Sequence, residues 1–553
     1  MLQCHVESKS RVKQIMQKDN REQSMGSIEM AGLDWCIDRM LPAFQRPPRL
    51  DVYDMRGVSR EVQLAATTLA GLVNRPQPRV YLINNDEDQF WLTQAFATIP
   101  QNVAVLKEND VLQAMLITYG NSVQGTIIYD PKLIDTVNVA TTLAGQRDGL
   151  VASPELARTL QQGHGLPVLE DLRNHKWHTR MQAYNWARHN LLTAASARLV
   201  AGLDPTNVNG LRSFLVATRT FVYWLDSRKY LPDLSNGLLS ERALMQTILD
   251  HFSAVAVHLG WFIAEGSGVS LTSQAGIPVL ASDFFYNLEV WTAVQPQQST
   301  VSKQAAEDEV PSPVTGKVYV SFTMSDGDNL QYCQHRMLYL WHDSNRGSLP
   351  IGWTLSPAIM QAAPAMANYY MSSATHNDEF VAGPSGAGYI FPSRWPTEQL
   401  APFLRRTGQL MRAMYMSTLQ VLDTDFLHSA GLPIGLKGMT FTNANQHHDY
   451  VQFLHPFGLR GMLSGAGLST AKTKNIDGVP LLQNLGLASN VAKTVRLIKN
   501  AAAAHRERPL FLNVYVLAWS MTPSDLKQVV QQFGSEYEIV LPKTLWAMRV
   551  SMK

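Results

Sequence analysis

The stretch KVYVSFTMSDGDN, residues 317–329, decides the fold expected for the second half of the chain. A run of β-forming and apolar residues leads directly into a polar turn that carries two aspartates. The same order of strand and polar loop returns in seven further segments: LPIGWTLSP (349–357), EFVAGPSG (379–386), LQVLDTD (419–425), GLKGMTFTNANQ (435–446), LRGMLSGAG (459–467), LFLNVYVLAWS (510–520) and YEIVLP (537–542). Helical stretches such as 398–414 and 523–534 separate several of them. About eight such units predict a (β/α) barrel or a close variant, whose polar loops line one catalytic mouth.

The first half reads as α/β as well. EVQLAATTLAGLVNR (61–75) has helical apolar spacing, RVYLIN (79–84) and TIIYD (126–130) read as strands, and LRSFLVATRTFVYWLD (211–226) reads as an amphipathic helix. The expected organisation is a polar lead-in at 1–45, an N-terminal α/β domain at 46–300, a linker at 301–316 and a barrel-like catalytic domain at 317–553. The linker lies within a polar, proline-containing stretch.

Composition narrows the function classes. The 553 residues are 45% hydrophobic and 17% charged, with a formal net charge of +2, so no nucleic-acid or membrane partner is expected. The three cysteines, Cys4, Cys36 and Cys333, form no CxxC pair, which argues against a disulfide framework or a thiolate metal cluster. The polar start has no apolar signal core. The expected location is the cytoplasm, with secretion as the alternative if the start is misassigned.

The motif SDGDN carries the sharpest chemistry. Asp326 and Asp328 follow the strongest strand and can aim into one cleft, where one carboxyl serves as acid and the other as base or nucleophile. The alternative is an ordinary turn, which favours the same residue types. An EF-hand is disfavoured, because Leu330 falls at a ligand position and Gln331 replaces the required glycine. A single cation held by the two aspartates stays open, while no cofactor is expected.

The stretch NDEFVAGPSGAGYIFPSRWP, residues 377–396, has a different character. Gly383 and Ser385 begin a nucleophile elbow, but Ala387 stands where its second glycine belongs and no helix follows. The stretch is therefore predicted to be a strand end with a shaped loop. The loop would position a set of carboxylate, hydroxyl and aromatic side chains: Asp378, Glu379, Ser385, Tyr389 and Trp395.

Aromatic side chains beside carboxylates suit sugars, because apolar ring faces stack while hydroxyls bond to the acids. Trp353, Trp519 and Trp261 also lie near predicted strand ends. The alternative is that Tyr389, Phe391 and Trp395 are core. In the first half, GWFIAEGSG (260–268) places Glu265 in a glycine-rich turn, from which it projects across the domain boundary or into solvent.

The segment GAGYIFP, residues 386–392, resembles the signature of the GxGYxYP family of putative glycoside hydrolases. Phe391 replaces the second tyrosine of that signature, so residue 391 gets no hydrogen-bonding role. SDGDN, PIGWTLSP and NDEFVAGPSG add to the resemblance, as do AATTLAGLVNR, GWFIAEG and SDFFYNLEV in the first half. The resemblance spans about residues 50 to 550. It implies an N-terminal α/β domain, a barrel-like C-terminal domain and a hydrolase directed at polysaccharides or glycosides.

The leading hypothesis is hydrolysis of a carbohydrate by paired carboxylates. One partner would be Asp326 or Asp328 and the other Glu379, Asp378 or Glu265. The residues expected to hold the sugar are Asn329, Trp353, Ser385, Tyr389 and Trp519. Two alternatives stay open: a non-catalytic glycan-binding protein on a hydrolase scaffold, and a metal-dependent carbohydrate deacetylase.

Overall fold

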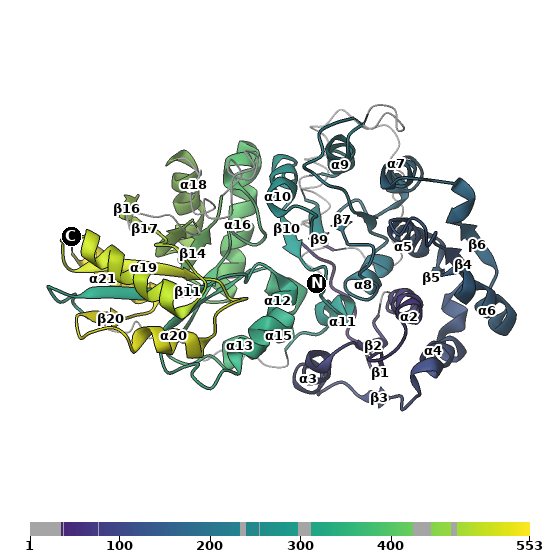
Figure 1. Ribbon diagram of the computed structural model, residues 1–553, viewed down its shortest axis with the longest axis horizontal. Helices are drawn as coiled ribbons and strands as arrows, with labels where there is room; N and C mark the ends of the chain where they lie inside the picture. Colours follow the sequence, from purple (N-terminus) through teal and green to yellow (C-terminus); the bar gives the residue numbers. More distant parts are fainter. Residues whose placement is uncertain are drawn as a thin grey trace.

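The protein is an α/β molecule of two halves that lie side by side along its longest dimension (Figure 1). The structure is a computed structural model that describes residues 35–36, 38–75, 77–232, 239–253, 255–296, 311–423, 444–465 and 473–552. Most of the expected lead-in and residues 301–310 of the expected linker therefore lie outside the described residues.

Three small parallel sheets form the N-terminal half. The first has the order β2-β1-β3, the second β5-β4-β6 and the third β10-β9-β7-β8. Their strands are β1 (Leu50–Asp54), β2 (Val80–Ile83), β3 (Gln101–Val103), β4 (Gly125–Ile128), β5 (Gly149–Ala152), β6 (Val168–Asp171), β7 (Leu199–Gly202), β8 (Phe221–Tyr223), β9 (Val257–Gly260) and β10 (Val279–Ala281). The third sheet lies nearest to the C-terminal half and the second lies at the far end (Figure 1).

Helices connect these strands and cover the sheets. They are α2 (Arg60–Val73), α3 (Asp86–Gln94), α4 (Val111–Tyr119), α5 (Thr136–Arg147), α6 (Pro154–His164), α7 (Arg180–Leu191), α8 (Arg212–Ala217), α9 (Glu241–Leu249), α10 (Glu265–Gln274) and α11 (Leu288–Ala293). The expected helix at 61–75 and strand at 79–84 are confirmed as α2 and β2.

The helix expected at 211–226 is wrong in its second part. Helix α8 ends at Ala217, and Phe221–Tyr223 is the strand β8. Arg219 between them has a φ of 52°, which a continuing helix does not allow. The apolar spacing was misleading because every residue of α8 and of β8 is buried, so the periodic contrast between faces is lost.

One ten-stranded sheet organises the C-terminal half. Its order is β16-β17-β15-β14-β13-β12-β11-β19-β18, with β20 beside β11. The strands are β11 (Val318–Met324), β12 (Ile351–Leu355), β13 (Asp378–Ala382), β14 (Thr418–Val421), β15 (Gly461–Ser464), β16 (Thr473–Ile476), β17 (Val479–Gln483), β18 (Leu487–Ala488), β19 (Leu510–Val516) and β20 (Tyr537–Ile539). Among the described strands of this sheet, only β16 and β17 pair antiparallel.

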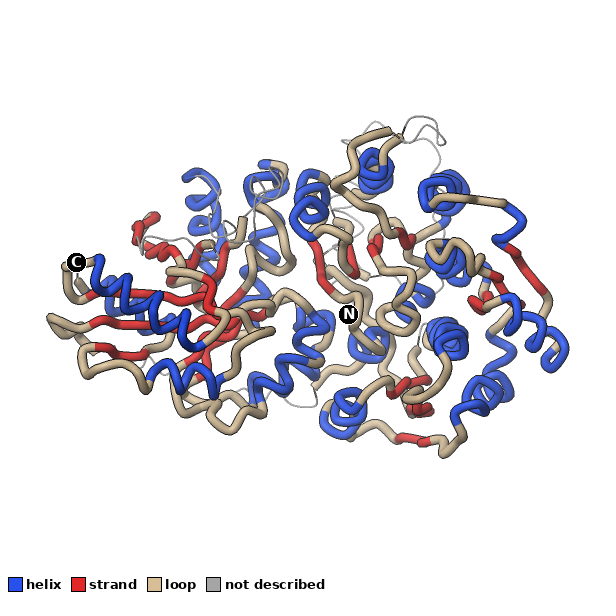
Figure 2. The backbone as a smooth tube through the Cα atoms, viewed as in Figure 1, coloured by secondary structure: helices blue, strands red, loops and turns tan. Residues whose placement is uncertain are grey.

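Helices surround the strands of this half (Figure 2). They are α12 (Leu330–Gln334), α13 (Arg336–Trp341), α14 (Ile359–Ala362), α15 (Pro364–Ser372), α16 (Thr397–Ala413), α18 (Ala444–Leu454), α19 (Val491–Ala504), α20 (Pro523–Val530) and α21 (Pro542–Ser551).

The sheet curls, because one stretch of chain joins its two sides. Strand β17 pairs with β15, and β18, a few residues later, pairs with β19. Between them Leu485 N donates to Asn513 O over 2.7 Å, and Tyr515 N donates to Gly486 O over 3.2 Å. Side-chain hydrogen bonds cross the enclosed space. Asn513 Nδ2 donates to Asn484 Oδ1, and Asn484 Nδ2 donates to Gln420 Oε1 on β14.

The expected eightfold barrel is seen only in coarse form, as a curled half-barrel. Strand β20 pairs with only the first three residues of β11, and the β16–β17 hairpin was not expected. Most of the expected unit at 435–446 lies outside the described residues. Because β11, β12 and β19 are parallel neighbours, their carboxyl ends lie at the same edge of the sheet, and the loops that follow them lie together there.

The two halves share a hydrophobic core. Trp91 on α3 lies 5.4 Å from Trp291 on α11 and 6.0 Å from Tyr370 on α15, measured between ring centroids. Trp91 Nε1 donates to Gln334 O over 2.8 Å. The boundary between the halves is thus a packed interface, on which a site can be positioned.

Candidate active site

Three carboxylates from two separate regions of the chain gather at this boundary. Asp326 and Asp328 lie in the turn between β11 and α12, at the carboxyl end of the curled sheet. Glu265 is the first residue of α10, which follows β9 of the third N-terminal sheet. Their charges act on one another, since Asp326 and Glu265 both raise the pKa of Asp328. The structure therefore brings together Asp326, Asp328 and Glu265.

The turn that holds the two aspartates is tightly built. A Cβ on Gly327 would lie 1.6 Å from Thr354 O, so only glycine fits against the end of β12. Gly327 N donates to Thr354 Oγ1 over 3.0 Å. Asp326 has a left-handed φ of 72°, an uncommon backbone conformation that aspartate tolerates better than most residues. The two interpretations of SDGDN, as an ordinary turn and as part of a functional site, are thus compatible.

Glu265 reaches the boundary from a helix, not from the turn that its glycine-rich context predicts. Helix α10 begins at Glu265 and tolerates glycine for a packing reason, because a Cβ on Gly268 would lie 2.3 Å from the Phe262 ring. Across the boundary the Tyr389 hydroxyl donates to Glu265 Oε1 over 3.2 Å. Tyr389 also pairs through its backbone with Val279, by N–O distances of 2.8 and 3.1 Å.

The glycines of the GAGYIFP loop permit this crossing. Gly386 has a φ of 138°, and a Cβ there would lie 2.8 Å from the Phe403 ring and from Thr407 Oγ1. A Cβ on Gly388 would lie 2.9 Å from Pro278. The loop therefore lies close to both halves and fixes Tyr389 between them. Phe391 is fully buried against Tyr389, with ring centroids 5.6 Å apart.

Aromatic side chains border the carboxylates. The Trp519 indole, which follows β19 and is 49% exposed, donates a hydrogen bond to Asp326. Trp261 stacks on Tyr389, with centroids 6.4 Å apart and planes at 19°. Tyr515 near the end of β19 is buried, and all three carboxylates raise the pKa of its hydroxyl.

Tyr515 was missed by the sequence reasoning. The sequence does carry a signal for it. Side chains two residues apart on a strand point to the same face, so Tyr515 lies on the same face of β19 as Asn513.

Burial controls the protonation of the cluster. Loss of solvent raises the pKa of Asp328 well above its ordinary value, and the negative charges of Asp326 and Glu265 raise it further. Loss of solvent also raises the pKa of Asp326, against hydrogen bonds from Ser325 and Trp519 that lower it. Since burial and the charges of two other carboxylates all raise its pKa, Asp328 is the member of the cluster in which the protonated form is most favoured.

Asp378 and Glu379 do not join the cluster. They begin β13, so they lie at the amino end of the sheet, whereas Asp326 and Asp328 follow the carboxyl end of β11. Asp378 is bound to Arg346 Nη1 over 2.6 Å. Glu379 accepts hydrogen bonds from Thr418 Oγ1 over 2.6 Å and from Lys543 N over 2.7 Å. Their positions and partners are structural, and the expected pairing with the aspartates is not formed.

Three further residues that were expected to hold sugar instead make contacts within the protein. Trp353 is 1% exposed inside the core, and its Nε1 donates to Asp378 Oδ1. Ser385 is fully buried, and its Oγ donates to Leu422 O over 2.8 Å. Asn329 caps α12 through a bond from Tyr332 N to its Oδ1. Of the expected sugar ligands, Tyr389 and Trp519 are the ones beside the carboxylates.

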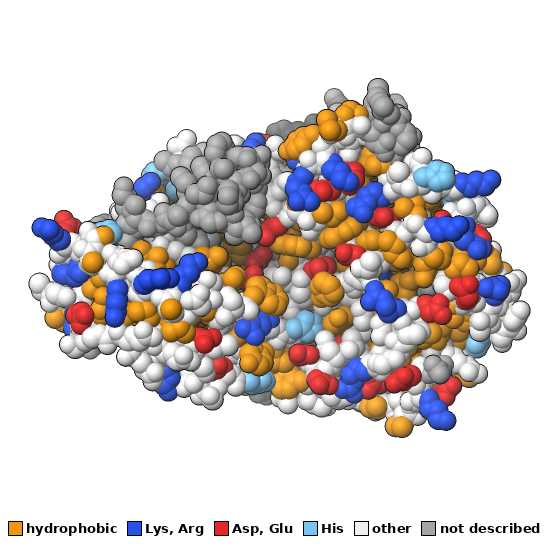
Figure 3. All heavy atoms as spheres, in the orientation of Figure 1, with side chains coloured by type: hydrophobic (Ala, Val, Ile, Leu, Met, Phe, Trp, Pro, Cys, Tyr) orange, Lys and Arg blue, Asp and Glu red, His pale blue; other side chains and the backbone are white. Residues whose placement is uncertain are grey.

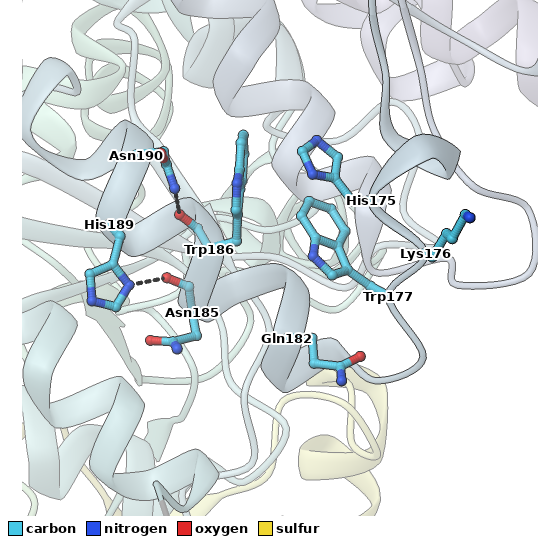
Figure 4. A pocket seen from close by; sticks show the side chains of 8 residues that line it. All are labelled: His175, Lys176, Trp177, Gln182, Asn185, Trp186, His189 and Asn190. Carbon is cyan, nitrogen blue, oxygen red and sulfur yellow. Dashed lines mark hydrogen bonds between the residues drawn. The ribbon is translucent and has the colours of Figure 1, made fainter. Parts of the chain in front are cut away.

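The surface is hollowed between the two halves, and acidic and apolar atoms are visible there (Figure 3). A second hollow, of about 380 Å³, lies between the segment that follows β6 and helix α7 in the N-terminal half. There His175 stacks on Trp177, with Trp186 beside both (Figure 4). Its lining contains no aspartate or glutamate, so it lacks the pair of carboxylates that glycosidase chemistry uses. Among the described residues no group of three or more His, Cys, Asp or Glu is arranged to hold a metal ion.

Family models match nearly the whole chain. The model described as "GxGYxYP putative glycoside hydrolase C-terminal domain" matches residues 316–549. Three models for the first, second and third domains of the same family match 49–118, 123–195 and 197–293. Each of these three ranges contains one of the small N-terminal sheets. The chain belongs to the GxGYxYP family.

A solved structure has the same fold. The crystal structure of a putative hydrolase from Bacteroides thetaiotaomicron VPI-5482 is similar with a TM-score of 0.77 and 20% identity, over 95% of this chain and 98% of that one. A putative polysaccharide deacetylase from Mycobacterium smegmatis has a TM-score of 0.31 and 10% identity, over 44% of this chain and 95% of that one. No curated protein matches the chain, and no helix within the described ranges has the length and apolarity to cross a membrane.

Proposed function

We propose that this protein hydrolyses glycosidic bonds with Asp326, Asp328 and Glu265, in a cleft at the mouth of a (β/α)-barrel-like domain. The observation that carries the proposal is the convergence of three carboxylates, one with a strongly raised pKa, beside the aromatic rings of Trp519 and Tyr389. The family description and the name of the solved relative support hydrolysis in general. The residue roles rest on the chemistry of the cluster.

Asp328 is assigned as the general acid. Its raised pKa favours the protonated form, which is the form that a glycosidase acid needs. It would give its proton to the glycosidic oxygen as the bond to the anomeric carbon breaks. Asp326 or Glu265 would stabilise the positive charge at that carbon. One of these two then acts as nucleophile, or activates the attacking water as base.

Trp519 and Tyr389 have supporting roles. Trp519 is half exposed and so offers a ring face to a sugar while it hydrogen-bonds Asp326. The Tyr389 hydroxyl holds one oxygen of Glu265 and leaves the other for substrate. A carbohydrate is the expected partner, because each of these groups matches a hydroxyl or an apolar sugar face.

The test is hydrolysis of 4-nitrophenyl glycosides and of polysaccharides by the full chain and its variants. Asp328→Asn, Asp326→Asn and Glu265→Gln should each lower kcat by about 10²- to 10⁴-fold, while a surface variant, Glu155→Gln, keeps wild-type kcat. Proton NMR of the first-formed anomer would then show retention or inversion. Full activity in the three carboxylate variants would sink the assignment. A glycan that binds but is never cleaved would instead identify a glycan-binding protein.

A further inference from the structure

A hollow of about 580 Å³ lies at the carboxyl end of the third N-terminal sheet and has no role in the bond cleavage proposed above. Its walls come from the loops after β7, β8 and β10 and from the start of α2. The lining residues that matter here are Arg60, Asp204, Asn207, Trp224, Asp283 and Phe284. All three strands belong to the third N-terminal sheet, whose remaining strand, β9, leads to Glu265.

The topology of this sheet favours a ligand at that place. From β7 the chain moves to β8 on one side, then crosses to β9 on the other side of β7 and continues to β10. Connections therefore leave the neighbours β7 and β9 in opposite directions. Open parallel sheets bind ligands in the crevice outside the carboxyl ends of such a strand pair. The loop after β7 supplies one wall of the hollow, and the loop after β9 supplies Trp261 and Glu265.

Two contacts join the hollow to the cluster. Trp261 N donates to Gly202 O over 2.8 Å, which ties the chain leading to Glu265 to the end of β7. Gln331 Nε2 donates to Asp283 Oδ1 over 2.5 Å. Gln331 lies on α12, three positions after Asp328, so a short stretch of chain links the rim of the hollow to the proposed acid.

The wall is fixed before any ligand binds. Buried Arg212 donates from Nε to Asn207 O over 2.6 Å and from Nη1 to Thr141 Oγ1 over 2.6 Å. Asn207 Nδ2 donates to Asp283 O over 2.6 Å. A Cβ on Gly210 would lie 2.0 Å from that same oxygen, so the loop fits closely against the end of β10. A preorganised wall binds with little loss of conformational entropy.

The lining selects a chemical class. Trp224 is half buried and Phe284 is 47% exposed, so both offer apolar ring surface. Asp204 and Asp283 offer acceptors, and because these two carboxyl groups outnumber the one cation in the lining, Arg60, they disfavour an anionic ligand. Ring surface with carboxylate acceptors matches a neutral sugar better than a phosphate or a purely apolar molecule.

We propose that this hollow is a distal subsite that holds a neutral sugar residue of an oligosaccharide whose scissile bond lies at Asp326, Asp328 and Glu265. The proposal rests on the proposed function, since it makes the substrate an oligosaccharide chain and not a single glycoside. Binding energy from the distal sugar would then be available to orient the reacting bond.

The experiment is calorimetric titration of the full-length Asp328→Asn protein with cello-, xylo-, malto- and manno-oligosaccharides of two to six units. For the series that binds, affinity should rise with chain length. Trp224→Ala and, separately, Phe284→Ala should weaken binding of the longest member about tenfold and leave the disaccharide unchanged. Phe284 is the gentler change, because its ring is already half exposed. Tyr415→Ala is the control. Tyr415 is 55% exposed and precedes β14, so it lies at the amino end of the curled sheet, away from the hollow.

A gain with chain length that survives both substitutions would overturn the subsite, and so would a lack of binding in all four series. The outcomes separate the two proposals. Binding that depends on Trp224, together with no cleavage by the wild type, leaves the subsite standing and removes the hydrolase. Cleavage that Asp328→Asn abolishes, with no effect of Trp224→Ala or Phe284→Ala on any oligosaccharide, does the reverse.

Discussion

The Tyr389 hydroxyl donates a hydrogen bond to Glu265 Oε1 over 3.2 Å, and the two residues come from opposite halves of the protein. Tyr389 lies on the GAGYIFP loop, and its backbone is paired with Val279 at the start of β10. The signature loop is therefore the element that attaches the curled sheet to the carboxylate of the third N-terminal sheet.

Tyr389→Phe tests this relationship, because it removes the hydroxyl and keeps the ring. We expect kcat to fall about tenfold or more, the usual effect of losing one hydrogen bond to a charged group. KM should change less, because the bond orients Glu265 and does not contact the substrate. The matched control is Tyr81→Phe, which removes another buried hydroxyl, bonded to Asp88 O. If Tyr81→Phe lowers kcat equally, the effect is one of stability.

Glu265→Gln should shift the pH dependence of the enzyme. The charge of Glu265 helps to raise the pKa of Asp328, so its removal should lower that pKa. Asp328 must be protonated to act as acid, and the basic limb of kcat/KM should therefore move to lower pH. The measurement is the pH profile of the residual activity, supported by carbon-13 NMR titration of the aspartate carboxyl groups. A basic limb that stays in place, with an unshifted Asp328 signal, would contradict the coupling.

Glu379→Gln should cost stability and leave catalysis intact. Glu379 accepts from two donors, Thr418 Oγ1 and Lys543 N, and an amide nitrogen cannot accept from either. We expect the free energy of unfolding to fall by about 1–3 kcal/mol, with kcat per folded molecule unchanged. Urea denaturation and turnover assays check the two parts. A large loss of kcat at wild-type stability would return Glu379 to the list of catalytic residues.

Asp88→Asn should flatten the pH dependence of stability. Burial raises the pKa of Asp88 to about 7, above the ordinary value of an aspartate. Between about pH 4 and 7 the folded state thus keeps a proton that the unfolded state has released, and stability falls as pH rises through this window. The variant has no such proton, so its loss of stability between pH 5 and pH 8 should be smaller. Each pKa unit of difference is worth about 1.4 kcal/mol. Parallel losses in both proteins would falsify the assignment.

Several features followed from the sequence. Strand β11 and the aspartates after it were read from KVYVSFTMSDGDN, because a buried strand and a polar turn each leave a local pattern. The family was identified from GAGYIFP and its companion motifs, which the family models bear out. Helix α2 and strand β2 followed from spacing alone. Where burial is complete on all sides, as from α8 to β8, the spacing carried no information on helix or strand.

What the sequence determined by itself was the family, the α/β class and the local position of Asp326 and Asp328 after a strand. Only the tertiary structure decided which carboxylate joins them. Glu379 is the second residue of β13, three residues before its carboxyl end, so at about 3.3 Å per residue it lies roughly 10 Å from that end. Glu265, distant in sequence, lies beside the aspartates because the third N-terminal sheet faces the end of β11. Proximity between loops of different sheets depends on how the sheets pack, and no local pattern of residues records it.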